Sequence, residues 1–201
     1  MADNLRYFAF YKPYGYLSQF TSEGKWLGLT TLNIFPKDVY ALGRLDADSE
    51  GLLLLTNDGS LNHILLNPKF KHTRTYWIQV EGDISEESVS LFRHPMELNY
   101  KGKTHRTFPS VASKLDLPDW VPDRDPPIRY RASIPTSWIS LTITEGKNRQ
   151  VRKMTAQVGH PTLRLIRHSI ENVTLEGLKP GDHKEIQRSE MYSLLGLSHR
   201  I

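Results

Sequence analysis

The chain has 201 residues, of which 38% are hydrophobic, and this is enough for one compact domain with a buried core, in one or two lobes. The 26 basic and 22 acidic residues give a formal charge of +4, which suits a polyanionic partner without identifying one. The absence of cysteine excludes disulfides, thiolate nucleophiles and Cys-ligated metal centres, and no apolar run is long enough for a membrane span or a signal peptide. We therefore expect a soluble, cytoplasmic protein.

The sequence predicts four strands and one loop. Aromatic and β-branched residues dominate "YFAFY" (7–11) and "YWIQVEG" (76–82), and a Pro or Gly turn closes each. The run "LLLLT" (52–56) is apolar on both faces, as expected of a central strand. "SWISLTITEG" (137–146) alternates as a strand does. "LDLPDWVPDRDPPIRYR" (115–131) contains four prolines, so a loop is predicted there.

Two short helices are predicted from their capping residues. The first follows Ser60, interpreted as the N-cap of "SLNHILLNP", in which apolar residues recur at helical spacing. The second covers residues 86–93, where Ser85 can cap the free amides. Ile84 and Val89 flank this start as a hydrophobic staple would.

A third helix is predicted over residues 148–159, with Asn148 as its N-cap and Gly159 as its stop. Its apolar face holds Val151, Met154 and Val158, and its opposite face holds Arg149, Arg152 and Lys153. From residue 147 to residue 168 there is no acid, and the basic residues are Lys147, Arg149, Arg152, Lys153, Arg164 and Arg167. The simplest interpretation of these basic residues is a helix face that is exposed to solvent. Without acids to pair these charges, a positive surface that binds a polyanion fits better.

Acidic side chains precede the apolar strand at 52–56 in "GRLDADSEGLLLLTNDG" (43–59). Asp46, Asp48 and Glu50 could simply decorate a turn, because aspartate favours turns through local hydrogen bonds. A phosphohydrolase Asp pair is an alternative, but such acids normally follow the buried strand and here they precede it. Magnesium binding by Asp46 and Asp48 would need further oxygen ligands, which nothing in the sequence singles out.

The same stretch resembles the first motif of the RNA pseudouridine synthases of the RsuA/RluB/RluE/RluF group. Three further segments resemble this family in order: "FAFYKPYGYLSQFT" (8–21), "KHTRTYWIQVEG" (71–82) and "EGKNRQVRKMTAQVGHPTLRLIRHSI" (145–170). The first of these begins within the first ten residues, so we expect the S4 RNA-binding module of other members to be missing, as in the RluE type. The resemblance implies a single catalytic domain over residues 1–201. It also implies an α+β fold, with a long, mainly antiparallel mixed sheet and flanking helices and loops around a central catalytic cleft.

By this resemblance, Asp46 is the catalytic aspartate of an isomerase that turns uridine into pseudouridine without a cofactor or a metal. A carboxylate can attack covalently or take a proton from the sugar, and the sequence leaves both roles open. Arg152 would pair with Asp46 and favour its ionised form. Tyr76 would stack on uracil and handle the C5 proton, and Leu163 would line the uracil pocket. Without the resemblance, Tyr76 and Leu163 would be interpreted as core residues.

The resemblance also implies an RNA partner, with large-subunit ribosomal RNA expected from the likeness to the RluE type. The target nucleotide must leave its stack, and Arg44 resembles the residue that fills the vacated place, although alone it is a surface arginine. Phosphate contacts are expected from Lys147, Arg149, Lys153, Arg164 and Arg167. We expect a monomer with no membrane and no nucleotide cofactor. Alternatives are a non-catalytic RNA-binding factor for ribosome assembly and, less well supported, the phosphohydrolase.

Overall fold

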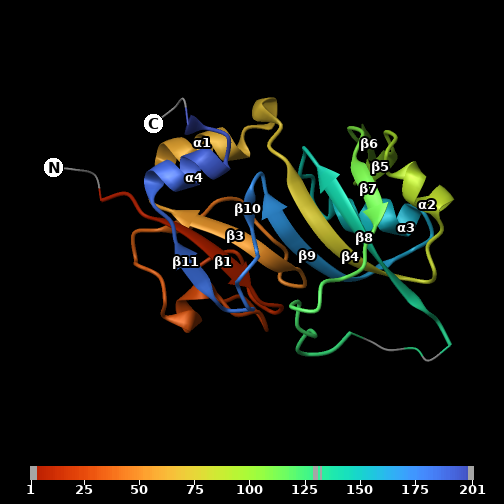
Figure 1. Ribbon diagram of the computed structural model, residues 1–201, viewed down its shortest axis with the longest axis horizontal. Helices are drawn as coiled ribbons and strands as arrows, with labels where there is room; N and C mark the ends of the chain where they lie inside the picture. The colour runs from red at the N-terminus through yellow and green to blue at the C-terminus, as the bar shows by residue number, and fades with distance from the viewer. Residues whose placement is uncertain (1–3, 129–130, 132, 199–201) are drawn as a thin grey trace. The chain divides into compact units, whose positions relative to one another are not determined.

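The computed structural model describes residues 4–128, 131 and 133–198. The fold is α+β, and the chain divides into two compact units (Figure 1). Unit 1 consists of Met1–Phe70 and Arg167–Ile201, and unit 2 of Lys71–Ile166. Strand β9 (Thr162–Ile170) contributes residues to both units. In the described part of the chain, no helix has the length and apolar composition needed to cross a membrane.

Unit 1 is built on a buried antiparallel strand pair. Strand β1 (Tyr7–Lys12) lies between β11 (His183–Glu185) and β3 (Glu50–Thr56) and is antiparallel to both. Every residue of β1 and β3 is buried, which confirms the predicted strands at 7–11 and 52–56. The short strand β2 (Tyr40–Ala41) pairs with β3, and β10 (Val173–Thr174) pairs with the end of β9.

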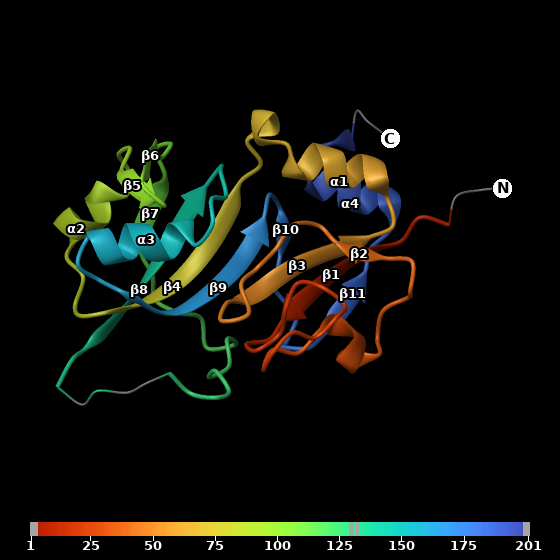
Figure 2. The same ribbon diagram turned by 180° about the vertical axis from the view of Figure 1, so that it is seen from behind.

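One face of this pair forms a hydrophobic core. Alternate residues of β1 and β3 point into it, together with two residues from the intervening segment: Phe8, Phe10, Leu53, Leu55, Leu29 and Val39. Leu29 begins the 3-10 helix η1 (Leu29–Leu32). Helices α1 (Gly59–Leu66) and α4 (Arg188–Leu194) both lie at the same end of these strands (Figures 1 and 2).

The predicted N-cap of α1 is wrong by two residues. Asp58 is the N-cap, and its carboxylate accepts hydrogen bonds from the backbone N–H groups of Ser60 and Leu61 at 2.9 and 3.2 Å. The sequence "NDGS" offers three candidate capping side chains, and a carboxylate is also favoured at the positive end of the helix dipole. Ser60 is therefore inside the first turn.

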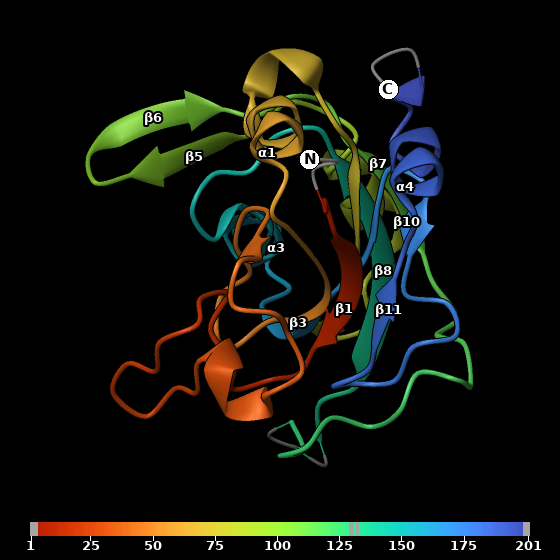
Figure 3. The same cartoon turned by 90° about the vertical axis from the view of Figure 1, so that its left-hand side faces the viewer.

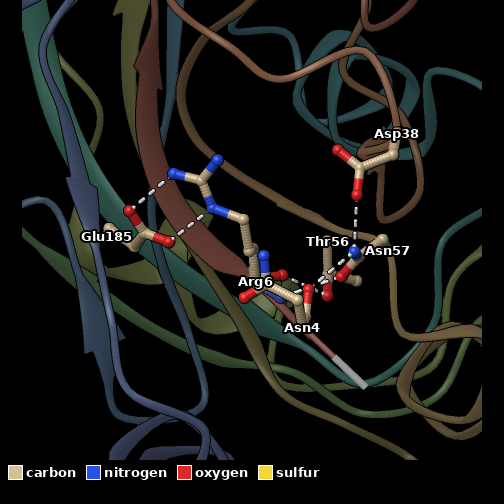
Figure 4. A network of polar contacts seen from close by, with 6 residues as sticks. All are labelled: Asn4, Arg6, Asp38, Thr56, Asn57 and Glu185. Carbon is tan, nitrogen blue, oxygen red and sulfur yellow. Dashed lines mark hydrogen bonds and ion pairs between the residues drawn. The ribbon is translucent and has the colours of Figure 1, made fainter. Parts of the chain in front are cut away.

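A polar network fixes the entry to β1 and the exit from β3 (Figure 4). Arg6 forms a two-pronged ion pair with Glu185 of β11 at 2.7 and 2.8 Å. Asn57 accepts from the Arg6 amide at 2.8 Å and donates to Asp38 at 2.8 Å and to the Asn4 carbonyl at 3.1 Å. Side chains thus satisfy backbone groups where the strand ladder ends.

In unit 2, a run of three neighbouring antiparallel strands has the order β4-β8-β7. Its strands are β4 (Arg74–Glu81), β8 (Thr136–Ile143) and β7 (Val111–Lys114), so the predicted strands at 76–82 and 137–146 are confirmed with shifted ends. A separate hairpin consists of β5 (Glu97–Tyr100) and β6 (Lys103–Arg106). The short 3-10 helix η2 (Pro68–Phe70) ends the first segment of unit 1.

The first helix of unit 2 begins as predicted. Helix α2 (Glu86–Leu91) has the predicted N-cap, because the Ser85 hydroxyl accepts from the Ser88 amide at 3.2 Å. Ile84 and Val89 are both fully buried, as a hydrophobic staple requires.

Helix α3 (Gln150–Gln157) starts one residue later than predicted. Arg149, and not Asn148, is its N-cap residue, with a φ of 50° and no side-chain capping bond. The Gln150 amide oxygen instead accepts from the Lys147 N–H at 3.0 Å. The predicted stop is confirmed, since Gly159 follows the C-cap with a φ of 89°.

The proline-rich stretch 115–131 forms an irregular loop, as predicted, although residues 129 and 130 lie outside the described part of the chain. The Asp125–Pro126 peptide bond is cis. Trp120 packs on Trp77 of β4 with ring centroids 5.6 Å apart. This contact ties the loop to the sheet of unit 2.

Candidate active site

The turn before β3 carries Asp46 at a half-buried position. The Ser49 amide donates to the Asp46 carbonyl at 3.0 Å and closes the turn. Glu50 then begins the buried strand. The carboxylate of Asp46 is therefore held next to the rigid strand β3 and remains accessible to solvent.

Hydrogen bonds from the segment after β1 hold the backbone on both sides of Asp46. The Ser18 hydroxyl accepts from the Leu45 N–H at 2.8 Å and donates to the Leu45 carbonyl at 3.0 Å. The Gly15 amide donates to the Ala47 carbonyl at 2.8 Å. Because both neighbours of Asp46 are fixed, its backbone has little freedom to move.

Lys12 anchors the same segment from inside the core. It is fully buried at the end of β1, opposite Gly51 of β3. Its ammonium group donates to the carbonyls of Pro13 and Tyr16 at 2.9 and 2.6 Å. These bonds fold the chain back into the turn that reaches Ala47. The signal of Lys12 in the sequence is a single charged residue at the end of the otherwise apolar strand YFAFYK.

The electrostatic surroundings of Lys12 connect it with the acids of the turn. Burial lowers the pKa of Lys12 to about 7, opposed by the negative charge of Glu50. The positive charge of Arg167 lowers it further, whereas Asp48 and Asp46 raise it. Lys12 therefore lies within electrostatic range of Asp46.

Two predicted RNA contacts lie in unit 1, and the structure places them differently. Arg44 is exposed, and its guanidinium approaches the Gln19 side-chain oxygen at 3.4 Å. Arg167 is only 3% exposed and donates to the carbonyls of Leu52 and Arg44 at 2.7 and 3.4 Å. A Cβ atom at Gly51 would collide with the Arg167 backbone, so glycine is required there. Arg167 thus braces β3 and is not part of a positive surface.

The remaining predicted site residues lie in unit 2. Tyr76 is 8% exposed on β4, paired with Leu141 of β8. Leu163 is half-buried on β9. Arg164 is only 4% exposed and donates to the Pro122 carbonyl at 2.9 Å, which fastens the proline-rich loop. Its expected place on a positive surface is wrong for the same reason as that of Arg167.

The start of α3 does present basic side chains as predicted. Val151 and Met154 are buried, while Lys147 and Arg149 are exposed and Arg152 and Lys153 are half-buried. The two-faced character of this segment follows from the helical period. It leaves a cationic surface without an acidic side chain between residues 147 and 168.

Residues 6–157 match the family model described as RNA pseudouridylate synthase. The chain is 49% identical over 187 residues to the ribosomal large subunit pseudouridine synthase E of Vibrio parahaemolyticus serotype O3:K6, covering 92% of this chain and 75% of the relative. The protein of the same name from Xanthomonas axonopodis pv. citri is 48% identical over 170 residues, which is 84% of this chain and 87% of the relative. The chain belongs to the RNA pseudouridylate synthase family.

A solved structure supports the same assignment. A crystal structure of a pseudouridylate synthase matches this synthase with a TM-score of 0.74 at 27% identity, over 95% of this chain and 74% of that chain. The α+β pseudouridine synthase fold and the activity as an RNA pseudouridine synthase, both expected from the resemblance, are thereby confirmed.

Ser18→Ala tests whether the bonds beside Asp46 matter for this synthase. We expect kcat to fall about tenfold, because the unpaired Leu45 amide and carbonyl let the turn shift, and small displacements of a reacting group are costly. RNA affinity should stay unchanged. Steady-state kinetics and binding measurements check this, with Ser113→Ala on an exposed β7 position as the control. A lower melting temperature with unchanged kcat would show that Ser18 only stabilises the fold.

Proposed function

We propose that this synthase converts a uridine of large-subunit ribosomal RNA into pseudouridine, with Asp46 as the catalytic carboxylate. The substrate class is supported by two relatives named ribosomal large subunit pseudouridine synthase E. The observation that carries the role of Asp46 is its turn, which is held on both sides by hydrogen bonds and continues into a fully buried strand. Such support is what positions a reacting group.

The reaction breaks the bond between C1′ and N1, turns the uracil and joins C5 to C1′. It involves no net oxidation or hydrolysis, so it calls for no redox cofactor. Asp46 serves it either by attacking the sugar or by taking a proton from it. We propose that Arg152 pairs with Asp46 and keeps it ionised, that Tyr76 stacks on the uracil and handles the C5 proton, and that Leu163 gives an apolar wall.

RNA binding needs cations and a side chain that replaces the everted base. Arg44 is exposed, and its planar guanidinium suits stacking in the place that the everted base leaves in the RNA. Lys147, Arg149 and Lys153 at the start of α3 are proposed to contact phosphates without reading sequence. We do not include Arg164 and Arg167, because both are buried and donate to carbonyl groups.

Three further proposals concern the protein as a whole. The two units serve as one catalytic domain, since the matched region 6–157 takes residues from both. The protein acts as a monomer, and it works in the cytoplasm. Light scattering of the purified protein tests the monomer directly.

Tritium release tests the proposed reaction. In RNA labelled with tritium at uracil C5, the label is lost when C5 joins the sugar. We expect release from unmodified large-subunit ribosomal RNA, and mapping pseudouridines in cells that lack the protein then identifies the target. RNA binding without release would favour the non-catalytic assembly factor, and magnesium-dependent phosphate release would favour the phosphohydrolase.

Arg152→Met tests the pairing with Asp46. We expect kcat to fall about 100-fold or more, because removal of one preorganised charge partner has effects of this size, with less than a threefold change in RNA affinity. Arg149→Met, three residues earlier at the start of the same helix, is the matched control and should weaken RNA binding while sparing kcat. If Arg152→Met lowers affinity alone, Arg152 is a phosphate contact and not the partner of Asp46.

A further inference from the structure

The β5–β6 hairpin of unit 2 is an exposed, cationic element that the activity described above does not use. Its strands are joined by Lys101 and Gly102, both with positive φ (52° and 81°), as a tight two-residue hairpin turn requires. The Gly102 amide donates to the Asn99 side chain at 2.9 Å. Figure 3 shows the hairpin extending away from the body of unit 2.

Three of the six exposed side chains of the hairpin are basic. We define the hairpin cations as Lys101, Lys103 and Arg106, and all three are exposed. Glu97 is the one acidic residue between 97 and 106. The tip at 101–104 is polar throughout, so it offers nothing to an apolar partner or to the interior of a membrane.

The hairpin cations adjoin the cationic start of α3. Lys153 donates from Nζ to the Asn99 carbonyl at 2.9 Å and lies over the Tyr100 ring, 4.8 Å from its centroid. Figure 2 shows α3 alongside β5 and β6. A cation of α3 therefore lies directly against the hairpin, although the two elements are about 50 residues apart in sequence.

A buried carboxylate fixes the other end of the hairpin. Glu145, with its side chain 9% exposed, pairs with the His105 ring nitrogen at 2.8 Å. Its other oxygen accepts from the Phe108 amide and from the Gln150 side chain, each at 2.9 Å. The hairpin is thus tied to the first residue of α3.

We propose that the β5–β6 hairpin is a second RNA-binding element, whose cations contact the sugar-phosphate backbone of the substrate RNA together with those of α3. This rests on the proposed function, which makes structured RNA the substrate. Exposed lysines and arginines on a fixed hairpin bind phosphates without reading sequence. They add affinity that depends on salt and leave the chemical step unchanged. An acidic protein partner is the competing occupant.

The double variant Lys101→Glu/Lys103→Glu tests the proposal. We expect RNA affinity to fall about 10- to 100-fold at low salt, and the dependence of log K on log salt to become shallower by about 1.4 to 1.8. At saturating RNA, kcat should match that of the parent protein. Fluorescence anisotropy with a ribosomal RNA fragment and tritium release give these two readouts.

Lys114→Glu/Lys179→Glu is the matched control, because it changes net charge equally at exposed sites outside the hairpin. Equal losses in both variants, or no loss in the hairpin variant, overturn the hairpin's role. Melting temperatures confirm folding, and the milder Lys101→Ala/Lys103→Ala should give a smaller loss in the same direction. A parent protein that binds RNA but releases no tritium overturns the proposed function and leaves the hairpin comparison intact.

Discussion

Asp46→Asn is expected to lower the rate of tritium release by about 10⁴-fold or more, with RNA affinity nearly unchanged. The amide has the size of the carboxylate but can neither attack a sugar carbon nor accept a proton from it. The hydrogen bonds of Gly15 and Ser18 go to the backbone of Ala47 and Leu45 and do not involve the Asp46 side chain, so they survive the substitution. Loss of one negative charge also does nothing to weaken phosphate binding.

Asp48→Asn is the control for this experiment. Asp48 stands two residues further along the same turn and is half-buried like Asp46, but no role in the reaction is expected of it. Single-turnover tritium release should therefore separate the two variants by several orders of magnitude. Activity of Asp46→Asn within tenfold of the parent would remove Asp46 from the reaction, and with it the pairing proposed for Arg152.

The elements that sequence predicts well are those fixed by local pattern. Strands β1 and β3 are read from runs of apolar residues, and the structure buries every residue of both. The start of α3 could not be read in this way. It depends on contacts among Gln150, Glu145 and the Lys147 amide, which local propensity does not encode.

The burial of two arginines also depends on contacts with residues that are distant in sequence. Arg164 and Arg167 resemble the neighbouring surface cations in sequence, yet both are buried. Their carbonyl acceptors belong to Pro122 and Leu52, which lie 42 and 115 residues away. A buried guanidinium needs such acceptors, and no sequence window contains them.

For the candidate site, resemblance and structure contribute different residues. Asp46, Tyr76 and Arg152 are assigned from the motifs of the family, because an aspartate in a turn and a tyrosine in a strand have commoner explanations. Lys12 and Ser18 emerge only from the structure, which shows what they hold in place. Motifs identify groups that react, and packing identifies groups that support them.

Asp58 joins three elements of unit 1 and is the position where a substitution should affect stability most. One carboxylate oxygen accepts from the hydroxyls of Tyr7 and Tyr192 at 2.8 and 2.7 Å. The other caps α1 through the amides of Ser60 and Leu61. Strand β1, helix α1 and helix α4 therefore meet on a single buried side chain.

Asp58→Ala is expected to lower the free energy of unfolding by about 3 to 7 kcal/mol. Loss of an N-cap costs about 1 kcal/mol, and each buried hydroxyl left without a partner costs about 1 to 3 kcal/mol. Urea denaturation measures the change. Tyr192→Phe removes one hydroxyl together with its need for a partner, so its cost should be only about 1 kcal/mol. Equal losses in the two variants would contradict the central place given to Asp58.

The stabilisation from Asp58 should also depend on pH. Burial raises the pKa of this carboxyl, but hydrogen bonds from Tyr192, Tyr7 and the two capping amides outweigh burial and lower it. Because the folded pKa lies below the unfolded value of about 3.9, the stabilisation is fully present above that value and is lost as pH falls through the folded pKa. The difference in unfolding free energy between the parent and Asp58→Ala should therefore be constant at neutral pH and shrink in acid. A difference that grows in acid would mean that the carboxylate is destabilising in the folded state.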